Sequence, residues 1–158
     1  MLQSIKSKGR RADGARFAIV ASQYNGRYVN AMLRAAAAEL KRAGAAGVRI
    51  IRVPGAYEIP LIAARLARGG EGEQPPDAII CLGVILRGQT VHAAHIGEAV
   101  SQALMRIQID CGVPIIHEVL LLENEEQARA RCLDRRHNRG MEAARTAVEM
   151  ALVMRELG

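Results

Sequence analysis

A short polar turn at residues 87–92, R-G-Q-T-V-H, separates an apolar stretch from a segment with helical periodicity. Such a turn presents backbone N–H groups at the positive end of the following helix, which favours binding of an anion. Gly88 lets the backbone approach a phosphate closely, and the Thr90 hydroxyl can add a donor. Ordinary capping of the helix by Thr90 would give the same pattern. The turn therefore predicts either an anion site or a simple helix cap.

Two histidines, His92 and His95, stand three residues apart at the start of the expected helix. Such a pair can form half of a metal site, but no Cys, Asp or Glu stands at the spacing that would complete it. A histidine beside an anion site suits proton transfer, because imidazole gains and loses a proton near neutral pH. We therefore expect His92 to shuttle protons, His95 to lie on a helix surface or an interface, and no metal to be bound.

Three further residues have useful chemistry, each with an ordinary alternative. The Glu58 carboxylate can accept hydrogen bonds from ligand hydroxyls, or it can simply face the positive end of the next helix. Arg131 can bind a phosphate with two hydrogen bonds, although a helix arginine is more often only solvated. Tyr24 can stack on a planar ring or cover the core.

Apolar periodicity places these residues in alternating strands and helices. Strands are expected at 16–21, 48–53, 78–86 and 113–120, and helices at about 29–40, 59–68, 96–107, 124–132 and 138–157. This alternation predicts an α/β fold with a parallel sheet and right-handed crossovers. Functional loops of such sheets gather at the carboxyl ends of the strands. That edge is expected to hold 22–26, 54–58, 86–92 and the residues after 120.

The charge of the chain is uneven. The formal net charge is +6, but residues 1–16 contain five basic side chains and one acidic one, so most of the excess lies there. We expect a flexible basic tail at 1–15 and one domain at 16–158. The domain is too weakly charged to coat nucleic acid, and its four aromatic residues cannot build a stacking platform for RNA. Nucleic acid is therefore not an expected partner.

The three cysteines, Cys81, Cys111 and Cys132, are spaced too far apart for a metal knuckle or a redox pair. Buried free thiols suit a reducing compartment. No apolar run is long enough to span a membrane, and the basic start lacks the apolar core of a secretory signal. The sequence thus predicts a cytoplasmic protein without a membrane partner.

The order and spacing of several motifs resemble those of the lumazine synthase family along nearly all of residues 16–157. The two most specific motifs are residues 53–60, V-P-G-A-Y-E-I-P, and residues 82–92, L-G-V-I-L-R-G-Q-T-V-H. Further matches follow at 112–114, at 123–128 leading to Arg131, and at 138–140 with 143–144 and 149–151.

This resemblance implies a three-layer αβα sandwich of the flavodoxin-like type with a four-stranded parallel sheet. It implies a transferase that condenses 5-amino-6-(D-ribitylamino)uracil with 3,4-dihydroxy-2-butanone 4-phosphate. The products are 6,7-dimethyl-8-ribityllumazine, phosphate and water, and the reaction is the penultimate step of riboflavin biosynthesis. Family members assemble at least as pentamers, in some cases as closed icosahedral capsids, with active sites between subunits. No cofactor or metal is implied, and riboflavin synthase is a candidate protein partner.

Transferred position by position, the resemblance assigns a role to each candidate site residue. The pyrimidine and its ribityl chain would contact Tyr24, Ala56, Tyr57, Glu58, the backbone of Val84, Ile85 and Leu86, and His117. Tyr24 would stack on the ring, and Glu58 would accept hydrogen bonds from ribityl hydroxyls. Phosphate would be bound by Gln89, Thr90 and Arg131, and the catalytic residue His92 would move protons.

The chain departs from the family pattern at several positions. His117 stands where an apolar aromatic residue usually faces the neighbour's site, and Glu118 replaces a usual glycine. We expect His117 either to lie against the neighbour's bound ring or to hydrogen-bond within its own subunit, for example to Glu118. Other departures are the leucines at 120–122, the alanines at 93–94, and Arg139 in place of a common lysine.

Three other functions fit parts of the pattern. A protein that only binds a flavin or lumazine would not need His92 or Arg131. A structural shell is compatible with catalysis, so particle size has to be measured together with activity. A generic flavodoxin-like nucleotide binder is disfavoured because the chain has no Walker or Rossmann glycine fingerprint.

Overall fold

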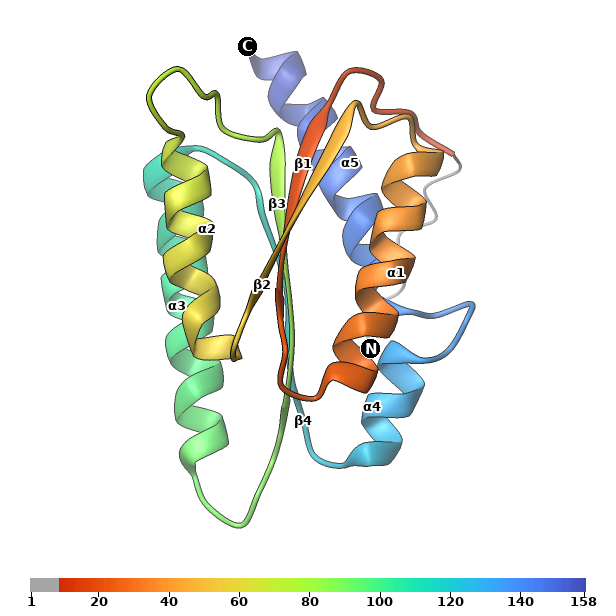
Figure 1. Cartoon of the computed structure of the whole chain (residues 1–158), viewed down its shortest axis with the longest axis vertical. Helices are drawn as coiled ribbons and strands as arrows, with labels where there is room; N and C mark the ends of the chain where they lie inside the picture. The colour runs from red at the N-terminus through yellow and green to blue at the C-terminus, as the bar shows by residue number, and fades with distance from the viewer. Residues whose placement is uncertain (1–8) are drawn as a thin grey trace.

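A computed structural model describes residues 9–158 of the chain (Figure 1). Strands and helices alternate in the order that the apolar periodicity predicts. The strands are β1 (Arg16–Ser22), β2 (Gly47–Val53), β3 (Ala78–Leu86) and β4 (Ile115–Leu122). The helices are α1 (Gly26–Arg42), α2 (Ile59–Arg68), α3 (His92–Cys111), α4 (Glu125–Cys132) and α5 (Arg139–Leu157), and a 3-10 turn, η1 (Ala56–Glu58), precedes α2.

The four strands form one parallel sheet in the order β2-β1-β3-β4, which confirms the predicted α/β fold. The chain starts in the interior of the sheet at β1, moves outward to β2, and then returns to place β3 and β4 on the other side of β1. The reversal falls between β1 and β3. In open α/β sheets the carboxyl edge at such a reversal is where ligands bind.

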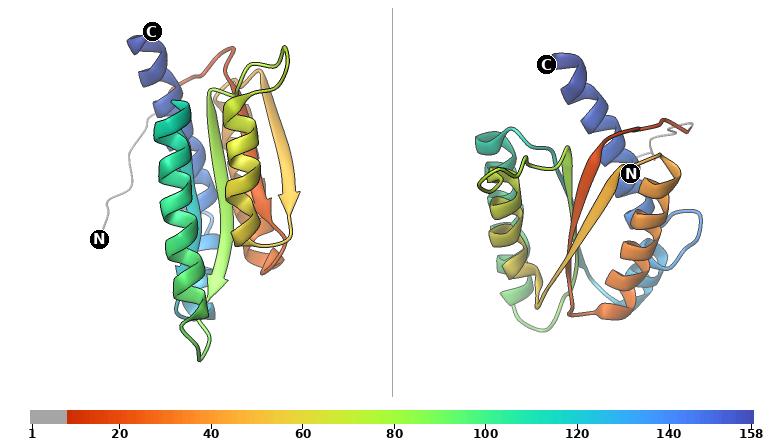
Figure 2. Two further views of the ribbon diagram at one scale, coloured as in Figure 1. Left: turned by 90° about the vertical axis from the view of Figure 1, so that its left-hand side faces the viewer. Right: turned by 45° about the horizontal axis from the view of Figure 1, so that its top comes forward.

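Helices cover both faces of the sheet (Figures 1 and 2). α2 and α3 lie on one face, and α1, α4 and α5 lie on the other. The central strand β3 is therefore shielded on both sides, and its first seven residues are all buried. This explains why its sequence is a continuous apolar run rather than an alternating one.

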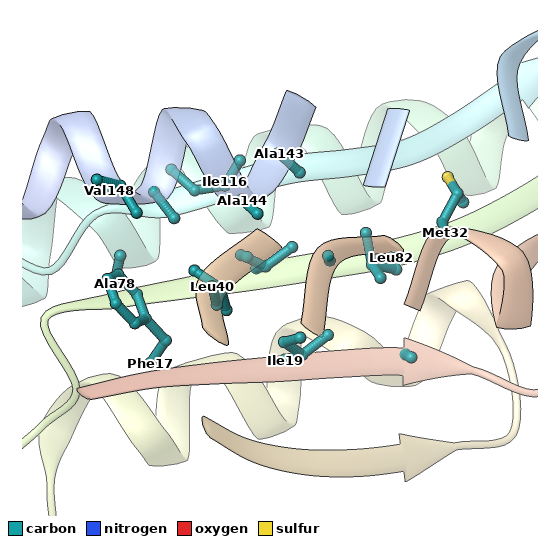
Figure 3. Packing of buried hydrophobic residues seen from close by; sticks show 14 of the residues in the cluster. Phe17, Ile19, Met32, Leu40, Ala78, Leu82, Ile116, Ala143, Ala144 and Val148 are labelled. Atoms are coloured by element: carbon teal, nitrogen blue, oxygen red, sulfur yellow. The ribbon is translucent and has the colours of Figure 1, made fainter. Parts of the chain in front are cut away.

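Two apolar clusters fill the spaces between the sheet and its helices. On the α1/α5 face, Phe17 and Ile19 of β1 and Leu82 of β3 pack against Met32 and Leu40 of α1 and the alanines of α5 (Figure 3). On the α2/α3 face, the alternate strand residues pack against Ile59, Val100 and Leu104. Successive residues of each strand therefore point to different clusters, as the pleat requires.

The contact between α1 and α5 is closer than side chains on both helices would allow. A methyl group added at Gly140, in the first turn of α5, would lie 2.0 Å from the Met32 carbonyl oxygen of α1. The Asn138 side chain caps α5 by accepting hydrogen bonds from the N–H groups of Gly140 and Met141. Asn138 also donates to the Cys132 carbonyl at 2.6 Å, which ties the end of α4 to the start of α5.

The ordered domain begins before residue 16, which corrects the boundary predicted for the basic tail. Ala12 and Ala15 are completely buried against the core. The Ala12 N–H donates to Ala43, and the Ala15 carbonyl accepts from Ala46. Residues 9–15 thus pack against the α1–β2 connection, whereas the rest of the predicted tail, 1–8, lies outside the described residues.

Several element boundaries differ from the sequence prediction: α1 begins at Gly26 rather than near 29, α3 ends at Cys111 rather than near 107, and the starts of β4 and α3 also differ. β4 begins at Ile115 rather than at residue 113, because Pro114 has no N–H to donate to the sheet; its carbonyl still accepts from Ile79 at 2.9 Å. α3 begins at His92, four residues before its first large apolar residue, Ile96. Its first turn is made of small and polar residues, so the apolar periodicity did not reveal it.

The cysteines of the described residues are free thiols. Burial raises the pKa of the Cys81 thiol to about 12 and that of the Cys132 thiol to about 11. Both are therefore protonated and unreactive at neutral pH. None of the helices seen between residues 9 and 158 is both long and apolar enough to cross a bilayer.

We expect Gly140→Ala to destabilise the fold strongly, because the added methyl group meets backbone of α1 that cannot move without separating the two helices. Overpacking of this kind typically costs about 1–3 kcal/mol, and we expect at least the upper end of that range. Chemical denaturation at fixed protein concentration measures the effect. Gly47→Ala is the control, because its methyl group would have no atom within 4 Å. Equal stability of the two variants would show that α1 and α5 are not held at this distance.

Candidate functional site

The carboxyl edge of the sheet carries most of the residues that the sequence singled out. The loops after β1, β2 and β3 lie together at this edge, at the bottom of Figure 1. Gln23 N–H donates to the carbonyls of Val53 and Pro54, and Tyr24 N–H also donates to Pro54 at 3.1 Å. These bonds join the loop after β1 to the loop after β2. Tyr24 is held by its backbone while its side chain remains 71% exposed.

Asn25 connects this loop to the central strand. It has a left-handed backbone conformation, with φ at 55°, which asparagine tolerates better than most residues. Its side-chain amide donates to the Val84 carbonyl of β3 at 2.7 Å. Sequence reasoning did not select Asn25. The available signal was an asparagine directly before the glycine that starts a helix, which is typical of a turn.

Gly55 brings Tyr24 and Glu58 together. A methyl group added at Gly55 would lie 3.0 Å from both a Tyr24 ring carbon and a Glu58 carboxylate oxygen. The Gly55 N–H donates to that same Glu58 oxygen, Oε2, at 2.9 Å. No hydrogen bond within residues 9–158 uses the other oxygen of Glu58. An aromatic face and an available carboxylate oxygen therefore flank the same glycine.

The neighbouring residues of η1 divide between core and solvent. Ala56 is buried, whereas the Tyr57 side chain is 66% exposed. Pro60 stands in the first turn of α2, where its missing N–H costs no helical hydrogen bond. The local fold of residues 54–60 thus follows from its glycine, its prolines and the hydrogen bond between Gly55 and Glu58.

The turn after β3 extends furthest from the sheet (Figure 1). Val84 is buried, Ile85 and Leu86 are half-buried, and residues 87–92 are exposed. Arg87 N–H donates to the Leu122 carbonyl at 2.8 Å, and its side chain pairs with Glu123 at 2.9 Å. The His92 N–H lies 3.4 Å from the Thr90 hydroxyl oxygen, a long contact of the helix-capping kind. The turn that carries Gln89, Thr90 and His92 is therefore open to solvent. Capping of the helix uses only one of the hydrogen bonds that the Thr90 hydroxyl can make, so it does not exclude a second role for this side chain.

His117 lies in the middle of β4, opposite Cys81 in the register, and its side chain contacts α3. Its Nε2 is 2.8 Å from the Ser101 hydroxyl, and its Nδ1 accepts from the Val119 N–H. The Ser101 hydroxyl donates to the Gly97 carbonyl, so the neutral His117 ring donates from Nε2. Burial lowers the pKa of His117 below its ordinary value. In the single chain its partner is Ser101 rather than the Glu118 that the sequence suggested as an example.

Glu118 lies on the opposite face of β4. Its carboxylate accepts two hydrogen bonds from Arg139 of α5, at 3.1 Å from Nε and 2.8 Å from Nη2. Arg139 also donates to Glu142 at 2.7 Å. Burial raises the pKa of Glu118, and the positive charge of Arg139 counteracts part of that rise. Neither Glu118 nor Arg139 was among the site residues predicted from the sequence.

Arg131 is exposed on α4, and no ion pair joins it to another of residues 9–158. α4 has only eight residues, of which Ala128 and Cys132 are buried. Polar contacts fix the helix at its start. The Asn124 side chain accepts from the Gln127 N–H at 2.9 Å, and the Tyr28 hydroxyl of α1 makes a short hydrogen bond with Glu125.

The candidate residues fall into two groups in the single chain. The first group consists of Tyr24, residues 55–58 and the turn at 87–92. Its Glu58 is the last residue of η1 and directly precedes α2, on one side of the sheet. Arg131 lies on α4 on the other side, and His117 is turned toward α3. Within residues 9–158 no hydrogen bond or ion pair connects the first group to His117 or Arg131. One chain therefore offers two partial sites rather than one closed site.

A cavity of about 540 Å³ lies at the other end of the sheet, between the starts of β1 and β2 and the end of α2. Its lining includes Phe17, Val48, Arg49 and Leu66 but none of the predicted site residues. The chemistry-bearing residues are better evidence for the site than this cavity, because they converge at the edge where parallel sheets bind ligands. No cluster of three or more His, Cys, Asp or Glu side chains suited to a metal ion occurs in residues 9–158.

The arrangement at the carboxyl edge can bind an aromatic ring against Tyr24 and a hydroxylated chain at Glu58, and can supply an anion with N–H and hydroxyl donors from the turn at 87–92. Comparison with known proteins identifies the family of the chain. Residues 14–155 match the family described as 6,7-dimethyl-8-ribityllumazine synthase. A protein of that name from Stenotrophomonas maltophilia (strain R551-3) is 41% identical over 150 residues, covering 94% of each chain.

Two further relatives carry the same name. The protein from Xanthomonas campestris pv. campestris (strain B100) is 39% identical and covers 89% of this chain and 90% of its own. The protein from Mycobacterium avium (strain 104) is 38% identical and covers 92% of this chain and 89% of its own. The family match at residues 14–155 thus covers nearly all of the described residues, including both groups of candidate residues.

We expect protonation of His117 to oppose folding. Because burial lowers its pKa in the folded state below the ordinary 6.5, the folded protein binds fewer protons there than the unfolded chain does. Protonation of His117 therefore lowers the free energy of unfolding as the pH falls through about 6.5 toward the folded-state pKa. Denaturation at several pH values should show His117→Phe gaining stability relative to the parent between about pH 7.5 and 5. Ser101→Ala, which keeps the imidazole, should retain the pH dependence. Parallel curves for the parent and His117→Phe would contradict this assignment.

Proposed function

The chain belongs to the 6,7-dimethyl-8-ribityllumazine synthase family, and we propose that its active site lies at the carboxyl edge of the sheet. The enzyme condenses 5-amino-6-(D-ribitylamino)uracil with 3,4-dihydroxy-2-butanone 4-phosphate and releases 6,7-dimethyl-8-ribityllumazine, phosphate and water. We place the site here because Tyr24, Gly55 and Glu58 lie together. An aromatic ring surface is thereby next to an acceptor for hydroxyl groups.

The first substrate lies across the ends of β1, β2 and β3. Its pyrimidine stacks on the exposed ring of Tyr24, and its edge meets the backbone of residues 84–86. The ribityl chain runs along Ala56 and Tyr57, and its hydroxyls donate to the Glu58 oxygen that Gly55 leaves available. A charged acceptor strengthens such bonds relative to neutral ones. Asn25, which binds the Val84 carbonyl, keeps the two loops in register.

The phosphate of the second substrate binds to Gln89, Thr90 and Arg131. The exposed turn at 87–92 supplies donors at the start of α3, and Arg131 supplies the positive charge. Binding places the ketone of the second substrate beside the free amine of the first. Holding two reactants in register removes several kcal/mol from the barrier of a bimolecular reaction.

The chemistry requires proton transfers and departure of phosphate. The amine attacks the ketone, and a first water leaves as the imine forms. Phosphate is then eliminated, and the enol that remains becomes a carbonyl. The ribityl-bearing nitrogen attacks this carbonyl, and a second water leaves as the ring closes. His92 at the start of α3 is exposed and adjacent to the phosphate donors, so it can move protons during these steps. Arg131 and the turn stabilise the negative charge of the departing phosphate.

A second chain completes the site. Glu58 and Arg131 have no contact within one chain, and they belong to elements on different sides of the sheet. α2 and α3 also expose large apolar side chains that a neighbour can cover, namely Leu61, Met105 and Ile109, at 73%, 56% and 72% exposure. A ring of subunits, a pentamer or an assembly of pentamers, would place Arg131 and His117 of one subunit at the Glu58 group of the next. Buried free thiols suit a cytoplasmic setting for this assembly.

Turnover tests the proposed function directly. Incubation of the purified protein with both substrates should produce the absorbance and fluorescence of the lumazine product, with or without EDTA. Arg131→Ala should raise the KM for the phosphorylated substrate by roughly 10- to 100-fold, the effect of losing a charged hydrogen bond, and should leave binding of a ribityl-pyrimidine analogue nearly unchanged. Arg135→Ala, which removes an exposed arginine from the α4–α5 connection, is the matched control. Failure of the parent protein to form product would refute the proposed function, and equal loss of affinity for the analogue would refute the role of Arg131.

Mixing of variants tests whether the site is shared. At limiting concentrations of the phosphorylated substrate, Glu58→Ala and Arg131→Ala are each expected to retain only a small fraction of the parent activity. The two variants are mixed under dissociating conditions and then reassembled. If Glu58 and Arg131 of one site come from different chains, some of the reassembled sites contain both residues intact. Random assembly of equal amounts predicts about one quarter of the parent activity. No recovery, with particle size by light scattering matching the parent, would show that both residues act within one chain.

A further inference from the structure

Arg87 is the first residue of the turn at 87–92, and it joins this turn to the end of β4. The last pair in the register of β3 with β4 is Leu86 with Leu122. Directly beyond this pair, the Arg87 N–H donates to the Leu122 carbonyl at 2.8 Å. Its side-chain Nη1 donates to Glu123 Oε1 at 2.9 Å. An ion pair thus extends the contact between the two strands at the point where the turn leaves the sheet.

Glu123 is held in place by the start of α4. Its backbone N–H donates to the Gln127 side chain at 3.0 Å. The Gln127 N–H donates to the Asn124 side chain at 2.9 Å, so Glu123 is part of the network that caps the helix. Ala128 is completely buried in the cluster on the α1/α5 face, which attaches α4 to the core. The partner of Arg87 therefore belongs to a part of the fold that is fixed by packing.

The rest of the turn has few bonds of its own. Gly88 and Gln89 make no hydrogen bond within residues 9–158, and the Thr90 hydroxyl has only its 3.4 Å contact with the His92 N–H. A methyl group added at Gly88 would have no atom within 4 Å. The donors assigned to phosphate thus stand on an exposed segment with little packing. Arg87 is the point at which this segment is fixed to the sheet.

Stability of the fold alone does not explain the ion pair. Its two side chains are 52% and 53% exposed, and an exposed ion pair contributes little to the free energy of unfolding. Its effect falls instead on the turn, because one additional contact orders a sparsely bonded segment more than it orders a packed one. A turn that is already held at one end loses less conformational entropy when it binds an anion.

We propose that Arg87 and Glu123 form a clamp that positions the phosphate-binding turn, so that both are positioning residues rather than phosphate ligands. This inference rests on the proposed binding of phosphate by Gln89 and Thr90. The bond to Glu123 compensates the charge of Arg87 locally, so Arg87 attracts a dianion only weakly while the pair is formed. Direct binding of phosphate by Arg87 would require the pair to open.

A double variant, Arg87→Ala with Glu123→Ala, removes the clamp and leaves the net charge of the protein unchanged. Inorganic sulfate is the probe, because it remains a dianion across the working pH range, and calorimetry on the full chain measures its affinity. We expect sulfate to bind about twofold to fivefold more weakly than to the parent, which is the range that an exposed ion pair can supply. The KM for the phosphorylated substrate should rise by the same factor, and affinity for a ribityl-pyrimidine analogue should not change.

The pair of Arg49 with Glu73 provides the matched control. Its nitrogen and oxygen are 3.0 Å apart, its side chains are 60% and 62% exposed, and both line the cavity at the other end of the sheet. Arg49→Ala with Glu73→Ala removes a comparable ion pair without touching the turn, so sulfate affinity should stay at the parent value. An equal loss in both double variants would overturn the proposal, because the loss would not depend on the turn.

Exchange of the two charges separates a clamp from direct contact with phosphate. Arg87→Glu with Glu123→Arg restores an ion pair in the reverse sense, so a clamp predicts recovery of most of the lost sulfate affinity. Amide hydrogen exchange of residues 88–91 should be faster in the alanine double variant and slow again after the charge exchange. If Arg87 bound the anion itself, the exchange would place a carboxylate beside sulfate and weaken binding further, which would refute the clamp.

Loss of the turn's own donors separates this proposal from the one on which it rests. If Gln89→Ala with Thr90→Ala leaves sulfate affinity unchanged, the turn is not the phosphate site and the clamp has no anion to serve. If that variant weakens sulfate binding but Arg87→Ala with Glu123→Ala does not, the phosphate site stands and the clamp is refuted. Denaturation and particle size by light scattering verify beforehand that each variant is folded and assembled like the parent.

Discussion

Burial of β3 on both faces is the constraint on which the other elements depend. A strand without a polar face has to be covered by helices on both sides, and in a parallel sheet each crossover supplies one of these helices. The chain therefore alternates strand and helix, and all four strands end at the same edge. The polar loops are left at that edge because the faces of the sheet are already occupied. The location of the functional residues is thus a consequence of how the core is covered.

Close packing of small residues sets the geometry of that edge. Gly140 lets the start of α5 lie directly against the α1 backbone, and the cap residue Asn138 joins this start to the end of α4. Gly55 performs a similar role among the loops, where the absence of a side chain brings Tyr24 and Glu58 together. At Gly140 the backbone of α1 leaves no room for a Cβ, so a glycine is required there. At Gly55 a Cβ would instead press on the side chains of Tyr24 and Glu58, which would have to shift by a few tenths of an ångström.

The charged and polar residues of the candidate site form two groups that do not contact each other within a single chain. The first offers an acceptor at Glu58 and donors at the turn after β3, and the second offers the positive charge of Arg131. An enzyme that joins two substrates and expels phosphate needs both groups at one place. The exposed apolar side chains of α2 and α3 indicate how a neighbour would bring them together. Assembly would then be part of the catalytic machinery.

The sequence by itself determined the α/β class, the order of its elements, the edge where function lies, and the family, because periodicity and local motifs are properties of consecutive residues. It missed the first turn of α3 and placed the domain boundary too late, since alanines at 12 and 15 and small residues after His92 carry no apolar period. Only the tertiary structure decided that His117 meets Ser101, that Asn25 holds Val84, and that Glu118 is buried beside Arg139. Each of these pairs joins residues far apart in the chain, and their partners follow from the pleat and register of the sheet. A strand residue points to one face or the other by position alone, so adjacent residues such as His117 and Glu118 meet entirely different helices.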